Sequence, residues 1–194
     1  MGEKEKVLLS FLELFPKADL FTLVYQSEKM DPLFRDRRIT TTFIQRLPFG
    51  QSHPSWYRPL YWGAMRSLNL TPYDLVISLH SACAKWVSPF VSATHVCYFQ
   101  SPMDGLWDEG DETAIPRQKG WLFRGYLQGC DLKSSRGVTH FLTVSDEARG
   151  LIQKLYGREA EVIPPTLDAK FLFKMQVYFR RIYGAAIQEE NLKV

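Results

Sequence analysis

The chain has 194 residues, of which 45% are apolar and 14% aromatic, and its formal net charge is +3. This length suits one globular domain with a substantial core, and the composition excludes a disordered chain. The small net charge does not favour nucleic acid as a partner, and no run of about 18 apolar residues predicts a membrane span. Without a secretory signal sequence, the expected compartment is the cytoplasm.

The apolar pattern predicts alternating helices and strands. In chain order, the helices are expected at residues 7–15, 59–68, 119–132 and 146–157, and the strands at 18–25, 39–47, 74–79, 94–99, 138–145 and 160–163. Such alternation favours an α/β protein with a Rossmann-like, doubly wound parallel sheet. The helix over 146–157 is the best delimited, because Ser145 suits an N-cap and Gly157 a stop.

Small polar residues follow the two most apolar strands. His80 and Ser81 come after residues 74–79, and Gln100 and Ser101 come after residues 94–99. Ligands of open α/β sheets bind outside the carboxyl ends of the strands, so we expect the functional site there. For each of these side chains the alternative is an ordinary polar end of a strand.

Three further groups of residues can be interpreted either as functional residues or as ordinary structural ones. Lys85 lies either near phosphates or in a solvated loop, and the acidic segment 104–112 is either a metal cluster or a solvated loop, with no spacing typical of metal ligands. The three cysteines have no paired spacing, so neither a disulfide framework nor a zinc site is expected. We predict no bound metal and no cofactor.

Residues 35–66 combine positive charge with aromatic side chains. This segment holds six arginines, one aspartate and no lysine or glutamate. Arginine and aromatic residues suit an anionic membrane surface, which predicts peripheral membrane contact at the inner face. A packed helix with solvated arginines is the alternative.

Four segments, at residues 5–25, 73–87, 95–108 and 151–168, resemble in order and spacing the N-terminal domain of glycosyltransferase family 4 (group 1) enzymes. The resemblance implies one half of a GT-B fold, in which two Rossmann-like domains enclose the active site. Residues 1–168 would be the acceptor domain of a retaining, hexosyltransferase-type enzyme that needs no metal. Its substrates would be a nucleotide sugar and a glycan or lipid-linked acceptor, with no role for nucleic acid.

Residue by residue, the resemblance implies His80 and Gln100 as catalytic residues and Ser81, Ser101 and Ser145 as substrate-binding residues. For Ser145, the other interpretation is a helix N-cap alone. The sequence departs from the family at Gln100, where the family commonly has histidine. A glutamine can bind a sugar hydroxyl but cannot titrate.

Two parts of the family pattern are expected to be missing. The first strand and its glycine-rich turn are not found, and residues 169–194 form an amphipathic helix where the donor domain would follow. Activity would then need a partner chain that carries the donor domain. The competing hypotheses are a non-catalytic remnant or a module that binds an acceptor or a membrane surface. A Rossmann-like oxidoreductase is disfavoured because no dinucleotide fingerprint occurs.

Overall fold

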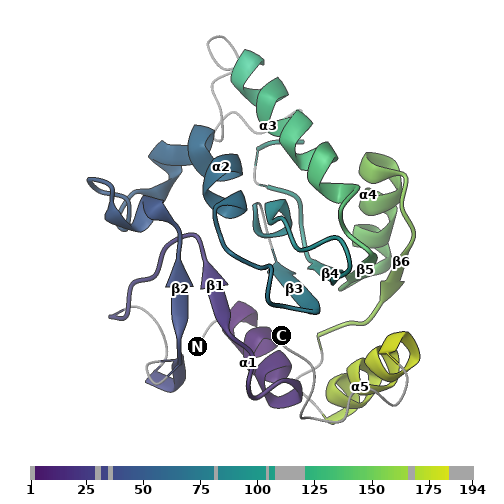
Figure 1. The fold of residues 1–194 in the computed structure, drawn as a ribbon. Coiled ribbons are helices and arrows are strands. Elements are labelled where there is room, and N and C mark those ends of the chain that lie inside the picture. Colours follow the sequence, from purple (N-terminus) through teal and green to yellow (C-terminus); the bar gives the residue numbers. More distant parts are fainter. Residues whose placement is uncertain are drawn as a thin grey trace.

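The computed structural model describes residues 3–28, 32–34, 37–80, 83–103, 105–107, 121–165 and 169–183 (Figure 1). Its helices are α1 (Glu3–Leu14), α2 (Tyr61–Arg66), α3 (Trp121–Ser135), α4 (Asp146–Tyr156) and α5 (Ala169–Tyr183). Its strands are β1 (Leu20–Thr22), β2 (Ile39–Thr41), β3 (Leu75–His80), β4 (Thr94–Phe99), β5 (His140–Thr143) and β6 (Ala160–Val162). Short 3-10 helices are η1 (Pro32–Phe34), η2 (Phe43–Arg46), η3 (Pro54–Leu60) and η4 (Ala84–Trp86).

The strands form two parallel sheets. β3, β4, β5 and β6 lie in that order in a four-stranded sheet, and β1 pairs only with β2 among the described strands. The parallel sheet flanked by helices confirms the predicted Rossmann-like α/β class. The first two strands, however, are hydrogen-bonded to each other and not to the larger sheet.

Helices cover both faces of the larger sheet (Figure 1). Alternate residues of a strand point to opposite faces. Val96 and Tyr98 of β4 therefore pack in the core that α1 and α5 share, while Cys97 and Phe99 pack in a second core with α4. Both faces of β4 are buried, which explains its unbroken apolar sequence.

The C-terminal helix α5 belongs to the same core as the sheet. Phe171 and Phe179 of α5 make edge-on contacts with the rings of Phe11 and Phe15, at distances of 6.2 and 5.1 Å between ring centroids. The apolar face predicted for residues 169–194 thus packs on α1 in its described part. The domain boundary at residue 168 stays a prediction.

Several predicted strands are shorter than expected, among them β1, β2 and β5, and β2 has the clearest cause. Residues 39–47 were predicted as extended, but β2 ends at Thr41. The Thr42 side chain accepts a hydrogen bond from the N–H of Ile44 at 3.3 Å, which caps η2. Threonine competes for backbone hydrogen bonds in this way, and the chain turns at that point.

Candidate functional site

The carboxyl ends of β3, β4 and β5 lie along one edge of the sheet. The register pairs His80 with Phe99 and Phe99 with Thr143. The residues that follow β4 and β5, including Gln100, Ser101 and Ser145, therefore emerge at this same edge. We call it the strand-tip edge.

The structure describes some of the predicted site residues in full and others only in part or not at all. His80 ends β3, but its side chain and all of Ser81 lie outside the described residues. Gln100 and Ser101 are partly exposed, and their side chains make no hydrogen bond to any described residue. Their amide and hydroxyl groups, which have no partner among the described residues, are therefore available to a ligand.

Ser145 has the N-cap role that its sequence position predicts. Its hydroxyl accepts a hydrogen bond from the N–H of Ala148 at 3.2 Å, and Gly157 ends α4 with a φ of 63°. The cap satisfies one of the free N–H groups at the start of the helix. Its substrate-binding role stays a prediction.

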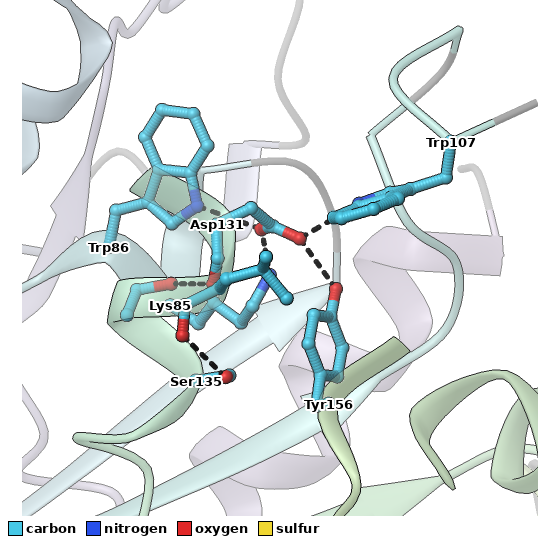
Figure 2. A network of polar contacts seen from close by, with 8 residues as sticks. Lys85, Trp86, Trp107, Asp131, Ser135 and Tyr156 are labelled. Atoms are coloured by element: carbon cyan, nitrogen blue, oxygen red, sulfur yellow. Dashed lines mark hydrogen bonds and ion pairs between the residues drawn. The ribbon is translucent and has the colours of Figure 1, made fainter. Parts of the chain in front are cut away.

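A buried polar network lies beneath the segments that follow β3 and β4. Its centre is Asp131 of α3, whose carboxylate receives hydrogen bonds at both oxygens (Figure 2). Lys85 forms an ion pair with Oδ1, and the indole N–H of Trp86 donates to the same oxygen at 2.9 Å. The indole N–H of Trp107 and the hydroxyl of Tyr156 donate to Oδ2 at 3.0 and 2.7 Å.

The network joins four separate parts of the chain. Lys85 and Trp86 belong to η4 after β3, Trp107 follows β4, and Tyr156 ends α4. Asp131 thus holds together the two segments that leave the strand tips. All four donors point at one carboxylate, so the network fixes the positions of the segments that follow β3 and β4 relative to α3 and α4.

The expectation of a solvated loop for Lys85 was wrong. The side chain of Lys85 is 5% exposed and that of Asp131 is 1% exposed. A buried charge is retained when an opposite charge and hydrogen bonds compensate for its lost hydration. Sequence reasoning missed Asp131 because it is 46 residues from Lys85 and looks like a polar position of an ordinary helix.

The arrangement favours a structural network and not an acid–base pair. Burial, together with the carboxylate of Asp131, raises the pKa of Tyr156, so its hydroxyl remains a donor. The Asp131 carboxylate already accepts four hydrogen bonds, which leaves it poorly placed to take a proton from a substrate.

The buried cysteines and His95 are not poised for catalysis either. Burial raises the pKa of Cys83 to about 12 and that of Cys97 to about 11, so both remain thiols. Burial lowers the pKa of His95 to about 4, and one ring nitrogen of this neutral histidine lies 2.9 Å from the hydroxyl of Ser78.

The described residues hold neither a cluster of metal ligands nor a membrane-spanning helix. No three His, Cys, Asp or Glu side chains there are grouped as metal ligands, and the acidic segment at 104 and 108–112 lies outside the described residues. None of the helices described combines the length and apolar character needed to cross a membrane.

The segment 43–60 holds four exposed apolar side chains. They are Phe43, Phe49, Trp56 and Leu60, which together we call the aromatic surface, and the rings of Phe49 and Trp56 lie 5.8 Å apart between centroids. Phe49 and Trp56 are 66% and 64% exposed, and the ring of His53 stacks on Trp56 at 4.8 Å. Arg46 is exposed in the same segment.

The backbone beneath the aromatic surface is held in place. Gln45 forms two hydrogen bonds with the backbone of Tyr25, at 2.8 and 2.9 Å, and the hydroxyl of Tyr57 donates to the carbonyl of Pro48 at 2.6 Å. Phe49 has a φ of 56°, a left-handed conformation that is unfavourable for a bulky residue. A rigid loop therefore presents an exposed phenylalanine at a conformational cost.

Comparison with protein-family models, with curated proteins and with solved structures finds no match for this chain.

Proposed function

We propose that this chain is the acceptor-binding half of a group 1 glycosyltransferase and binds a hydroxyl-rich acceptor at the strand-tip edge. The observation that carries the proposal is the position of Gln100 and Ser101. They follow a central strand of a parallel sheet and leave their polar groups unpaired among the described residues. Ligand sites of open α/β sheets occur at this edge. The four family-like segments in the sequence give independent support.

The chemistry assigns positioning roles to the described residues. A sugar hydroxyl of the acceptor donates to the amide oxygen of Gln100 or accepts from its N–H₂ group, and Ser101 supplies a second partner. The acceptor oxygen then bonds to the anomeric carbon of the donor as the bond from that carbon to the phosphate oxygen breaks. The proton of the hydroxyl passes to the departing phosphate. His80, at the end of β3, is proposed to stabilise the charge that develops.

A donor domain on a partner chain would complete the site. We assign the nucleotide sugar to that partner, because the resemblance to group 1 glycosyltransferases implies a donor domain that holds it. Holding acceptor and donor together accounts for much of the rate of such a transfer. The isolated chain should therefore bind the acceptor and transfer no sugar until the partner is added.

Titration calorimetry with methyl and short alkyl glycosides of glucose, galactose and mannose tests the acceptor site. Gln100→Ala should weaken binding at least about fivefold, because it removes one or two hydrogen bonds to the sugar. Thr71→Ala is the matched control, since Thr71 is exposed and precedes β3 at the opposite edge. Equal binding by both variants, or none by the parent chain, would reject the acceptor site.

A second candidate function is docking to an anionic membrane surface, and the aromatic surface favours it. Phe49 and Trp56 are exposed on a rigid loop with Arg46 close in sequence. Aromatic side chains partition to the membrane interface while arginines attract anionic headgroups. This contact would bring a lipid-linked acceptor to the strand-tip edge, or act alone in a non-catalytic module. Either version places the protein in the cytoplasm at the inner membrane face.

Co-sedimentation with vesicles of phosphatidylcholine, with and without phosphatidylglycerol, tests the membrane contact. Binding should require the anionic lipid and weaken with salt. Trp56→Ser should lower the partition coefficient about tenfold, from the loss of one inserted aromatic side chain. Phe90→Ser is the control, because Phe90 is 55% exposed outside the aromatic surface. An equal loss in the control, or no binding to either vesicle, would contradict the contact.

A further inference from the structure

A large cavity separates the two sheets. Its volume is about 660 Å³, and residues of β1 and β3 line it from opposite sides. Leu8, Phe11 and Leu12 of α1 and Met65 of α2 contribute to its walls. We call this cavity the strand groove; Figure 1 shows the positions of β1 and β3, whose residues line it.

The backbone of β1 presents unpaired polar groups to the groove. The N–H of Leu20 donates to the carbonyl of Arg38, and the carbonyl of Thr22 accepts from the N–H of Thr42. Both groups point toward β2. Backbone groups of successive residues in a strand point to opposite sides. The N–H and C=O of Phe21 are therefore directed away from β2, to the side of the groove.

The backbone of β3 also presents unpaired N–H and C=O groups to the groove, from the side opposite β1. The carbonyl of Asp74 accepts from the N–H of Thr94 at 2.8 Å, which fixes the even-numbered residues of β3 as the ones bonded to β4. The N–H and C=O groups of Leu75, Ile77 and Leu79 are directed to the groove. No described strand pairs with β3 on this side. The open side of a strand offers a row of N–H and C=O groups that pair with a further strand, so the groove suits an occupant that carries both donors and acceptors.

The dimensions of the groove fit one strand. The hydroxyl of Tyr73 donates to Asp19 at 2.5 Å, so the starts of β3 and β1 meet at one end and both strands then run along the groove. One residue of a strand within a sheet fills roughly 160 Å³, from a rise of about 3.3 Å, a strand spacing of about 4.8 Å and a layer spacing of about 10 Å. On this basis, about 660 Å³ holds about four residues.

The lining also specifies the side chains of the occupant. Most of the described lining residues are apolar, and within this described set Asp19 is the one carboxylate and there is no Lys, Arg or His. Since Asp19 is at the end where Tyr73 binds it, the middle of the groove favours uncharged side chains. Strands buried on both faces of a parallel sheet are rich in Val, Ile and Leu.

We propose that the strand groove accepts a β-strand from another polypeptide. The strand is an extended segment of about four apolar residues that runs parallel to β1 and β3. Its N–H and C=O groups pair with Phe21 on one side and with Leu75, Ile77 and Leu79 on the other. Binding joins the two sheets into one. This inference is independent of the proposed glycosyl transfer.

Peptides with the sequences of residues 74–80 and 94–99, blocked at both ends and flanked by lysines, serve as strand probes. Fluorescence anisotropy should show saturable binding of at least one peptide to the full chain. The same peptide with alternate backbone amides N-methylated keeps its side chains but loses donors, and it should bind at least about tenfold more weakly. Hydrogen exchange should slow at residues 21, 75, 77 and 79 when the strand is bound.

A matched pair of variants tests whether the peptide binds in the strand groove. Ile77→Pro removes an N–H directed to the groove, and proline is tolerated on the unpaired side of an edge strand. It should weaken binding relative to Ile77→Ala, with circular dichroism confirming that both variants fold. Failure of both peptides to bind would overturn the proposal. Equal binding of the N-methylated peptide would also overturn it and would indicate a cavity for small apolar molecules.

Discussion

The buried Lys85–Asp131 pair makes a quantitative prediction about stability. Asp131→Asn removes the negative charge while nearly keeping the shape of the side chain. Lys85, with its side chain 5% exposed, is then left with an uncompensated charge. Removing one partner of a buried ion pair typically costs about 3–5 kcal/mol. Because a domain of this size has a free energy of unfolding of roughly 5–15 kcal/mol, we expect a large loss.

Urea unfolding followed by tryptophan fluorescence and circular dichroism measures this loss. With a slope of about 2 kcal/mol per molar urea, a loss of about 4 kcal/mol lowers the midpoint by about 2 M. Trp86 and Trp107 both contact Asp131, so fluorescence reports on the network itself. The double variant Lys85→Met with Asp131→Asn should recover at least half of the loss, since no buried charge remains.

The exposed pair of Arg181 and Glu161 is the control. Their side chains are 64% and 43% exposed, so water and salt screen the pair and Glu161→Gln should leave the urea midpoint nearly unchanged. If Asp131→Asn costs no more than this control, the pair is solvated and our account of the network is refuted. If the double variant is no more stable than Asp131→Asn, the cost does not come from the charge left on Lys85.

Three further predictions concern pH, packing and capping. The pKa of folded His95 is lowered to about 4, whereas that of an unfolded histidine is about 6.5. As the pH falls across this window the unfolded chain binds a proton first, which should lower the free energy of unfolding by up to about 3 kcal/mol. Urea unfolding of His95→Gln at several pH values should lack this loss. Gly50→Ala would bring a Cβ within 1.9 Å of the Ile44 carbonyl and should lower the melting temperature, whereas Gly63→Ala, in open space on α2, should not. Ser145→Ala should cost about 1 kcal/mol in urea unfolding by removing the α4 cap, and an unchanged midpoint would contradict that role.

Local signals in the sequence predicted much of the fold. The run at 74–79 corresponds to β3 at Leu75–His80, and residues 94–99 correspond to β4 without a shift. β4 is almost wholly buried and β3 is partly buried, so a short unbroken apolar run identifies both strands. Ser145 and Gly157 were predictable because a cap and a left-handed stop depend on neighbouring residues.

Features that join distant residues were not predictable. The partner of Lys85 is 46 residues away, and no local pattern marks Asp131 as buried. The division into two sheets was missed for the same reason, because strand pairing depends on which backbone edges meet in space. Of the candidate site, the sequence predicted the edge where Gln100 and Ser101 lie but not the network beneath it.

The central claim is that a hydroxyl-rich acceptor binds at the strand-tip edge. Titration of the ¹⁵N-labelled chain with a methyl glycoside, followed by amide chemical shifts, tests it most directly. The account predicts saturable shifts at Gln100 and Ser101 and at the start of α4, with none at Phe21 or Ile77. Shifts confined to Phe21 and Ile77 would place the sugar in the strand groove, and no shifts at all would mean that the edge binds no such acceptor; either result would contradict the claim.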